Sequence, residues 1–167
     1  MRVAKVLRFQ ILKVSVEEFE KWFTNIINEE DIDIEYDARL ENLIVKAEAG
    51  ELHQSVVTVF TDWFKEIQQQ AERTSGQKFR RRTERGLGLA GPHRGSRKVP
   101  DGMIKRKGEF YPVIALEVGV TETLEKLFED AERLLRGSKG ITQLVILVKI
   151  TEVSTHPTDG YPWDQQP

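Results

Sequence analysis

Apolar residues recur at helical spacing in three stretches of the chain. They predict helices over about residues 15–27 and 51–73, and a third from its expected N-cap, Thr121, to about residue 136. Ser15 and Glu18, three residues apart, have the form of the capping box that starts a helix. The longest of these helices is expected to pack through an apolar stripe formed by Leu52, Val56, Val59, Phe60, Trp63 and Ile67.

Shorter apolar or alternating runs between the helices predict strands. These runs cover residues 3–14, 32–36, 40–47, 77–83, 98–106, 111–118 and 143–150. The last run is almost continuously apolar, which is typical of a strand buried on both faces of a sheet. From residue 98 onward the order is strand, turn, strand, helix, strand, so we expect the last two strands to be parallel through a right-handed crossover. The glycine-rich segment 86–96 is predicted to be a loop. The whole pattern predicts an α/β fold.

Length and composition fit a single intracellular domain. With 167 residues, 39% of them hydrophobic and 31% charged, the chain is long enough to bury a core. We expect one domain over residues 1–150 and an irregular tail over residues 151–167. The chain has no cysteine, which excludes disulfides and thiolate metal sites. No apolar run approaches the roughly 18 residues of a membrane span, so we expect a cytoplasmic or nuclear protein with no membrane partner.

A strongly basic block lies in the middle of an otherwise acidic chain. Residues 78–107 contain eleven Lys and Arg against two acids, so the block carries +9 and the remainder −11 of a net charge of −2. Such a block attracts phosphate, and DNA is the partner that we expect. The candidate contacts are Arg80, Arg81, Arg82, Arg94, Arg97 and Lys105. A solvated loop that serves solubility explains the same charge equally well.

Two carboxylates fall where a predicted hairpin brings strand ends together. Asp101 follows Pro100 near the start of one strand, and Glu117 lies near the end of the next. Hard divalent cations take oxygen ligands, often one or two carboxylates together with water and phosphate. A cation held there lowers the pKa of a bound water and neutralises charge on a phosphoryl group. We therefore expect Mg²⁺ (or Mn²⁺) at Asp101 and Glu117, with the carbonyl of Val118 as a further ligand.

These residues resemble the motif of the PD-(D/E)XK nuclease superfamily. Pro100-Asp101 is followed by Leu116-Glu-Val-Gly-Val-Thr-Glu122 at the end of an apolar strand, and then by a helix and a strand. The chain is most similar to the restriction-endonuclease-like proteins of bacteria and fungi, which also have a tyrosine-containing hairpin and a helix opening with histidine, here Tyr36 and His53. The resemblance covers about residues 10–150. It implies a restriction-endonuclease-like core, with a central mixed sheet flanked by helices, and Mg-dependent endonuclease activity on DNA.

The sequence departs from the superfamily at the residue that completes its motif. There the superfamily has a lysine that orients or activates the attacking water, and this chain has Gly119. Lys98, three residues before Asp101, is the first candidate to replace that lysine as a catalytic residue. Lys126 on the third predicted helix and Lys149 on the last predicted strand are the others.

The start of the second predicted helix supplies further candidates. The resemblance implies an acidic residue of this helix in the metal shell, which is either Glu51 or Glu48. His53 either orients a water or phosphate, or bonds to a neighbour as an ordinary partly buried histidine. An acid near a helix N-terminus is also favoured by the helix dipole alone.

Three functions remain open on the sequence alone. The first is a metal-dependent endonuclease with Asp101, Glu117 and Lys98 as its catalytic residues. The second is a catalytically inactive nuclease-fold module that binds nucleic acid or a protein partner, and the third is an interaction domain with no nucleic-acid role. The two acids favour the nuclease, whereas Gly119 favours the module, and Asp101 also fits a simple turn residue after proline. A homodimer is compatible with each.

Overall fold

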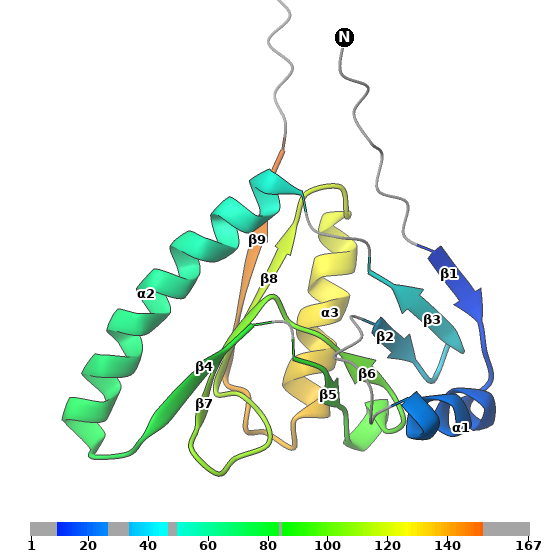
Figure 1. Cartoon of the computed structure of the whole chain (residues 1–167), viewed down its shortest axis with the longest axis horizontal. Helices are drawn as coiled ribbons and strands as arrows, with labels where there is room; N and C mark the ends of the chain where they lie inside the picture. Colours follow the sequence, from blue (N-terminus) through cyan, green and yellow to red (C-terminus); the bar gives the residue numbers. More distant parts are fainter. Residues whose placement is uncertain (1–9, 27–33, 47–49, 84, 152–167) are drawn as a thin grey trace, which may run out of the picture.

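The computed structural model describes residues 10–26, 34–46, 50–83 and 85–151, which fold into α-helices and two β-sheets (Figure 1). The helices are α1 (Val16–Ile26), α2 (Glu51–Ser75) and α3 (Leu124–Gly137), with a 3-10 helix, η1 (Gly91–His93). The strands are β1 (Gln10–Lys13), β2 (Ile34–Asp37), β3 (Asn42–Val45), β4 (Phe79–Arg82), β5 (Leu87–Gly88), β6 (Arg97–Lys98), β7 (Gly102–Arg106), β8 (Ile114–Gly119) and β9 (Leu144–Lys149). The predicted α/β class is confirmed. None of the helices in these ranges has the length and apolar character needed to span a bilayer.

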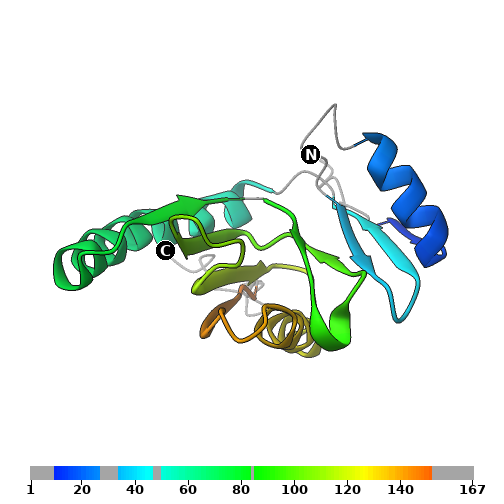
Figure 2. The ribbon, with the colours of Figure 1, turned by 90° about the horizontal axis from the view of Figure 1, so that it is seen from below.

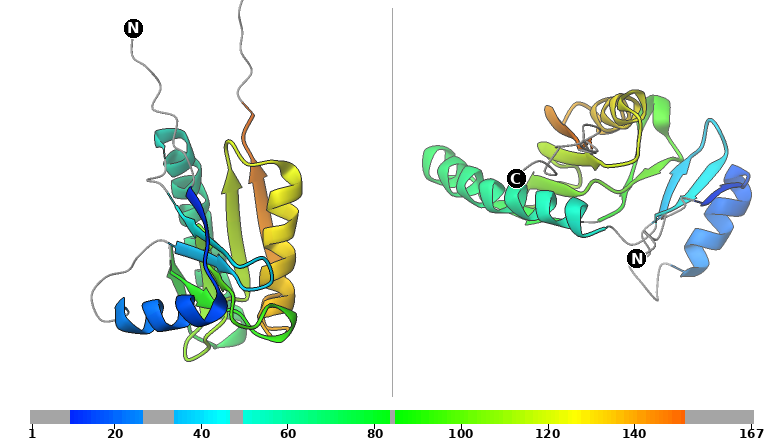
Figure 3. Two further views of the ribbon diagram at one scale, coloured as in Figure 1. Left: turned by 90° about the vertical axis from the view of Figure 1, so that its right-hand side faces the viewer. Right: turned by 90° about the horizontal axis from the view of Figure 1, so that it is seen from above.

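One sheet is mixed, with the strand order β4-β7-β8-β9. Its first three strands are antiparallel neighbours, whereas β8 and β9 are parallel and are joined through α3, as the sequence predicts. Helix α2 covers one face of this sheet and α3 the other (Figures 2 and 3). The α2 face is packed by Val57, Phe64, Ile104, Leu116 and Val118.

The face of the mixed sheet that α3 covers carries both apolar and acidic side chains of β8. Ala115 packs on the α3 side together with Met103 and Leu134. Because successive side chains of a strand point to opposite faces, Glu117 lies on this α3 side as well. A carboxylate is therefore placed under a helix, in a part of the fold where apolar side chains are the rule.

The other sheet is antiparallel, with the strand order β1-β3-β2-β6-β5. Helix α1 packs on it through Phe19, whose ring stacks on Tyr36 with 3.9 Å between the ring centroids. The strand β5 and the 3-10 helix η1 come from the glycine-rich segment 86–96, which was predicted to be a loop only. The chain then passes from this sheet to the mixed sheet through residues 99–101.

The predicted strand over residues 98–106 is wrong as a single element. It is broken into β6 and β7 at Pro100, which has no N–H to donate to a sheet ladder. After the break, Asp101 N donates to Leu116 O at 3.0 Å and starts the pairing of β7 with β8. The described ranges consequently form two sheets, where the sequence predicted one central sheet.

The last strand is also less buried than its apolar run predicts. β9 lies at the edge of the mixed sheet, beside β8, and Leu144 at its start is 48% exposed. The apolar run reflects contacts made from both faces, because Val145 packs toward the α3 side and Ile146 and Val148 toward the α2 side. Both faces of β9 therefore make core contacts, as predicted, but its side chains are only partly buried because the strand lies at the edge of the sheet.

The helix starts are predicted with mixed success. The capping box of α1 is confirmed, because Glu18 N donates to Ser15 Oγ at 3.3 Å and Ser15 N donates to Glu18 Oε2 at 3.0 Å. For α3 the N-cap is Thr123 and not Thr121, since the Thr123 hydroxyl oxygen accepts from Lys126 N at 3.2 Å. Both threonines lie directly before the apolar stripe, so the pattern alone did not separate them.

The predicted stripe of α2 is only partly correct. The buried residues of this helix are Val57 and Phe64, which lie beside the predicted stripe and are not part of it. Three residues of the predicted stripe, Leu52, Val59 and Trp63, are exposed. Apolar residues occupy more of the helix circumference than the mixed sheet covers, so the sheet contact decides which of them are buried. Residues 3–9 of the first predicted strand, Glu48 and the predicted tail beyond Thr151 lie outside the described ranges.

Candidate functional site

The two predicted carboxylates lie where the chain enters the mixed sheet. The register of β7 and β8 pairs Gly102 with Leu116, which puts Asp101 and Glu117 next to this pair. Val118 N donates a hydrogen bond of 2.6 Å to Asp101 Oδ2, so the Asp101 carboxylate is held against β8 beside Glu117. The structure therefore brings these two residues together.

Lys98 lies among three carboxylates. Its Nζ atom is 2.7 Å from Glu35 Oε1, 3.0 Å from Asp130 Oδ2 and 3.2 Å from Glu117 Oε2. These acids come from β2, α3 and β8; Lys98 Nζ donates a hydrogen bond to Glu35 Oε1 and forms ion pairs with Asp130 and Glu117. Burial lowers the pKa of Lys98, but Glu117, Glu35 and Asp130 together raise it well above 10.5. Lys98 therefore stays charged in the protein interior, where its ammonium is surrounded by three acids.

A second lysine, which the sequence analysis did not single out, lies closer to solvent. Lys46 Nζ donates to Val99 O at 2.9 Å and lies 3.1 Å from Glu35 Oε1 and 3.9 Å from Asp101 Oδ1. Its side chain is 16% exposed, compared with 2% for Lys98. Burial acts against its charge, yet the neighbouring Glu35 raises the pKa of Lys46 above its usual value.

His53 contacts the other side of Asp101. Located in the first turn of α2, it places Nε2 3.4 Å from Asp101 Oδ2. This hydrogen bond raises the pKa of His53, against the effect of partial burial. Burial raises the pKa of Asp101, but His53 and Lys46 hold it below its usual value. Asp101 is therefore ionised, with Oδ2 engaged by two donors and Oδ1 within 4 Å of one ammonium.

Glu117 is the least satisfied acid of this network. Its Oε2 atom lies near Lys98, whereas Oε1 is buried and has no hydrogen-bond partner among the residues that the structure describes. Burial raises the pKa of Glu117 to about 8, and Lys98 and Lys46 oppose that rise only in part. A buried carboxylate oxygen without a partner is costly, so this atom is either protonated or a position for a cation.

Two charged residues of α3 complete the network. Asp130 is also paired with Lys126 one turn earlier, and Arg133 NH2 donates to Tyr36 O at 2.8 Å. The sequence analysis missed Asp130, although it contains the signal. Asp130 lies three residues after Leu127 and four before Leu134, and is therefore on the buried stripe of the helix.

Gly119 has a packing role at the position where the superfamily carries its lysine. A Cβ atom at Gly119 would lie 2.9 Å from Leu127 Cδ1, closer than real Cβ contacts come. No side chain fits there unless the buried Leu127 moves. Of the other candidate lysines, Lys126 pairs with Asp130 and Lys149 Nζ donates to Val120 O.

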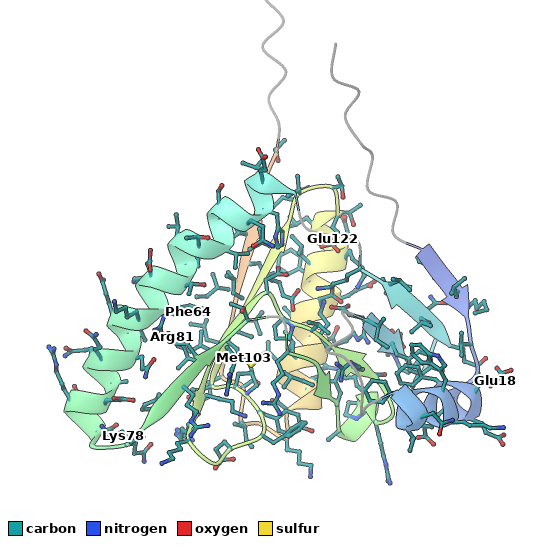
Figure 4. All side chains as sticks on the ribbon, in the orientation of Figure 1. Glu18, Phe64, Lys78, Arg81, Met103 and Glu122 are labelled. Carbon is teal, nitrogen blue, oxygen red and sulfur yellow. The ribbon has the colours of Figure 1, made fainter. Side chains whose placement is uncertain are left out.

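The other predicted ligands contribute less. Glu51 is exposed at the first residue of α2, and its carboxylate makes no ion pair within the described ranges. The side chain of Val118 is buried on the α2 face, and its N–H serves Asp101. Glu122, after β8, is half-buried, and burial raises its pKa (Figure 4).

Two carboxylate oxygens of this network have no close hydrogen-bond donor among the described residues. Glu117 Oε1 lacks a partner, and the nearest cation to Asp101 Oδ1 is 3.9 Å away. Two carboxylates with water and phosphate are a usual set of ligands for Mg²⁺. Within the described ranges no group of three or more His, Cys, Asp and Glu is arranged to hold a metal.

The six predicted DNA contacts do not form one surface. Arg80, Arg82 and Lys105 lie on one face of the β4–β7 pair, as the register shows. Arg81 points to α2, where its Nε donates to Gln68 Oε1 at 3.0 Å (Figure 4). Arg94 is exposed at the end of η1. Arg97 packs over the ring of Phe23 and donates to Ile34 O.

Comparisons with protein-family models, with curated proteins and with solved structures find no match to this chain. The fold and the site alone therefore define its class. It is an α/β protein with a buried network of carboxylates and ammonium groups at the junction of two sheets.

Proposed function

We propose that the chain is a metal-dependent nuclease that hydrolyses DNA phosphodiester bonds at Asp101 and Glu117, on a restriction-endonuclease-like core. The observation that carries the proposal is the adjacency of these two carboxylates, each with one oxygen that no close donor engages. The order β8, α3, β9, with α2 on the opposite face of the sheet, agrees with the core that the sequence resemblance implies.

The residues around the two acids have separable roles in this proposal. Asp101 Oδ1 and Glu117 Oε1 would hold Mg²⁺ or Mn²⁺, which when bound lowers the pKa of water and neutralises charge on the phosphate. Val118 N–H and His53 orient the Asp101 carboxylate. Lys46 is better placed than Lys98 to meet a phosphate, because its ammonium is partly exposed and lies beside Asp101.

A second candidate function is a binding module that keeps the fold without the chemistry. The observation in its favour is Lys98, whose ammonium already forms ion pairs with Glu35, Glu117 and Asp130. In that case the network serves to join the two sheets and α3, and DNA or a protein is bound elsewhere on the surface.

Cleavage of plasmid and single-stranded DNA with Mg²⁺ or Mn²⁺ tests the proposal. We expect wild-type activity to fall in Asp101→Asn and Glu117→Gln by more than the roughly 10- to 100-fold that loss of a metal's outer-shell partner costs. These changes keep side-chain size, and thermal melting checks that each variant is folded.

Asp62→Asn is the matched control, because Asp62 is exposed on α2 and far along the chain from both acids. Its activity is expected to equal that of wild type. Metal-dependent cleavage that survives in both site variants would contradict the nuclease proposal. A wild-type protein that binds DNA without cleaving it would support the binding module instead.

A further inference from the structure

Three cations lie on the α3 side of the mixed sheet, on the β4–β7 pair, and a fourth is close to them. Arg80 lies opposite Lys105, and Arg82 lies opposite Met103. Met103 packs on the α3 side of the sheet, so Arg80, Arg82 and Lys105 share that side by alternation. Arg85 follows three residues after Arg82 and acts on Lys105 electrostatically. We call these four residues the β4–β7 cationic cluster.

This cluster has no counter-charge in the described part of the chain. Among those residues none of the four forms an ion pair, whereas nearby Lys78 pairs with Glu72 at 3.6 Å. Partial burial and then Arg85, Arg82 and Arg80 lower the pKa of Lys105, which shows that the four charges repel one another. Arg80, Arg82 and Arg85 are exposed. Such a concentration of like charge is stabilised by an external anion.

An exposed aromatic ring lies at the same end of the sheet. Phe110 belongs to the connection between β7 and β8, four residues after Arg106, and is 53% exposed. Its ring packs edge-on against Tyr111, with 4.9 Å between centroids, and the Tyr111 hydroxyl donates to Gly88 O at 3.0 Å. The contact with Tyr111, which is itself anchored to Gly88, therefore holds the Phe110 ring in place. Nucleic-acid bases stack on such rings when they are unpaired.

The cluster and the proposed cleavage site lie on one line of the sheet. Lys105 is four residues along β7 from Asp101, which corresponds to about 13 Å of strand. Glu117 lies on the same α3 side of the sheet as Lys105. Met103, which lies between Asp101 and Lys105 on this side, is buried against Leu87 and Leu134, so a nucleic-acid strand bound over the cluster does not continue along this face to the acids.

We propose that the β4–β7 cationic cluster binds the phosphate backbone of a single-stranded segment of nucleic acid and that Phe110 stacks on one of its bases. The inference rests on the proposed function in taking nucleic acid as the ligand, and it deepens that function by naming the form of the substrate. Arg81 and Arg97 have structural roles and are not part of this surface.

Fluorescence anisotropy with a labelled oligodeoxythymidine of about a dozen nucleotides, in EDTA, tests the backbone contacts. We expect Arg80→Gln/Arg82→Gln to weaken binding by about tenfold and to reduce the slope of log K against log salt by about 1.4. The matched control is Lys21→Gln/Lys65→Gln, which removes the same charge from exposed positions on α1 and α2. Equal weakening in both double variants would overturn the assignment.

Phe110→Ala tests the stacking contact with the same probe. We expect it to weaken single-stranded binding by about tenfold and to leave duplex binding within about twofold. Equal losses for both forms would overturn the single-stranded proposal. Binding to vesicles containing phosphatidylserine, in the absence of oligonucleotide binding, would overturn it in favour of a membrane surface.

Binding in EDTA and cleavage in Mg²⁺ separate the two proposals. Oligonucleotide binding that depends on the cluster, without any cleavage, would support the cluster assignment and contradict the nuclease proposal. Cleavage that depends on Asp101, with binding unaffected in the arginine variants, would contradict the cluster assignment and support the nuclease proposal.

Discussion

Leu127 fills the space next to Gly119, and this contact governs what the last residue of β8 can be. The nearest side-chain atoms of Leu127 would lie 2.9–3.2 Å from a Cβ at Gly119. Leu127 is fully buried on the inner stripe of α3, so it has little room to move. The absence of a lysine at this position follows from helix packing and does not itself indicate a lost activity.

Substitution at Gly119 is therefore expected to reduce stability. Gly119→Ala should lower the free energy of unfolding by about 1–3 kcal/mol, the usual cost of overpacking a core, in urea denaturation. Gly88→Ala is the control, because nothing lies within 4 Å of a Cβ at Gly88, and we expect a change within about 0.5 kcal/mol. Gly119→Lys should not raise DNA cleavage. A stable Gly119→Lys variant with increased cleavage would contradict this account.

At the scale of elements, the two-residue strand β6 adds buried charge contacts to a junction where Leu87 of β5 also packs with Met103 and Leu134. Lys98 connects β6 to β2 through Glu35, to β8 through Glu117 and to α3 through Asp130. Arg133 ties α3 to β2 through Tyr36 O. The antiparallel sheet is thus attached to the mixed sheet and to α3 by buried charges. Such pairs are sensitive to the removal of one partner.

Removal of the Lys98 ammonium should loosen this junction. We expect Lys98→Met to lower the free energy of unfolding by about 3–5 kcal/mol, because buried carboxylates lose their counter-ion. Lys78→Met, at a mostly exposed ion pair, should change it by less than about 1 kcal/mol. Adding Asp130→Asn to Lys98→Met should recover part of the loss, measured as the coupling in a double-mutant cycle. No recovery would show that Lys98 acts through packing alone.

At the scale of the whole molecule, stability depends on protons bound inside the charge network. Burial raises the pKa of Glu117 from 4.5 to about 8, so between these values the folded chain holds a proton that the unfolded chain has released. Unfolding free energy therefore falls as the pH rises through this window. Asp101, whose pKa is lowered, contributes stability that is lost only at acidic pH.

Urea denaturation from pH 5 to pH 8 tests this dependence. Wild-type unfolding free energy should decrease across the window, and Glu117→Gln should flatten the decrease, because the amide stays neutral throughout. His53, whose pKa is raised, contributes a fall in the same direction, so His53→Gln should remove a smaller part. Equal slopes in wild type and Glu117→Gln would show that Glu117 does not hold the proton.

The sequence by itself determined the features that depend on local spacing. The capping box at Ser15 and Glu18, the three helices, the parallel pairing of β8 with β9, and the adjacency of Asp101 and Glu117 all follow from residues close in the chain or joined by one turn or one helix. Their physical basis is helical and strand periodicity together with the short reach of a hairpin.

Only the tertiary structure decided which charges meet. Lys98 and Glu35 are 63 residues apart and lie on adjacent strands of the antiparallel sheet, and no periodicity in the chain specifies that they pair. The face of α2 that is buried, the division into two sheets at Pro100 and the role of Lys46 were decided in the same way. Each depends on how the two sheets and α3 pack, because a charged side chain takes its partners from whatever the fold places within a few ångströms of it.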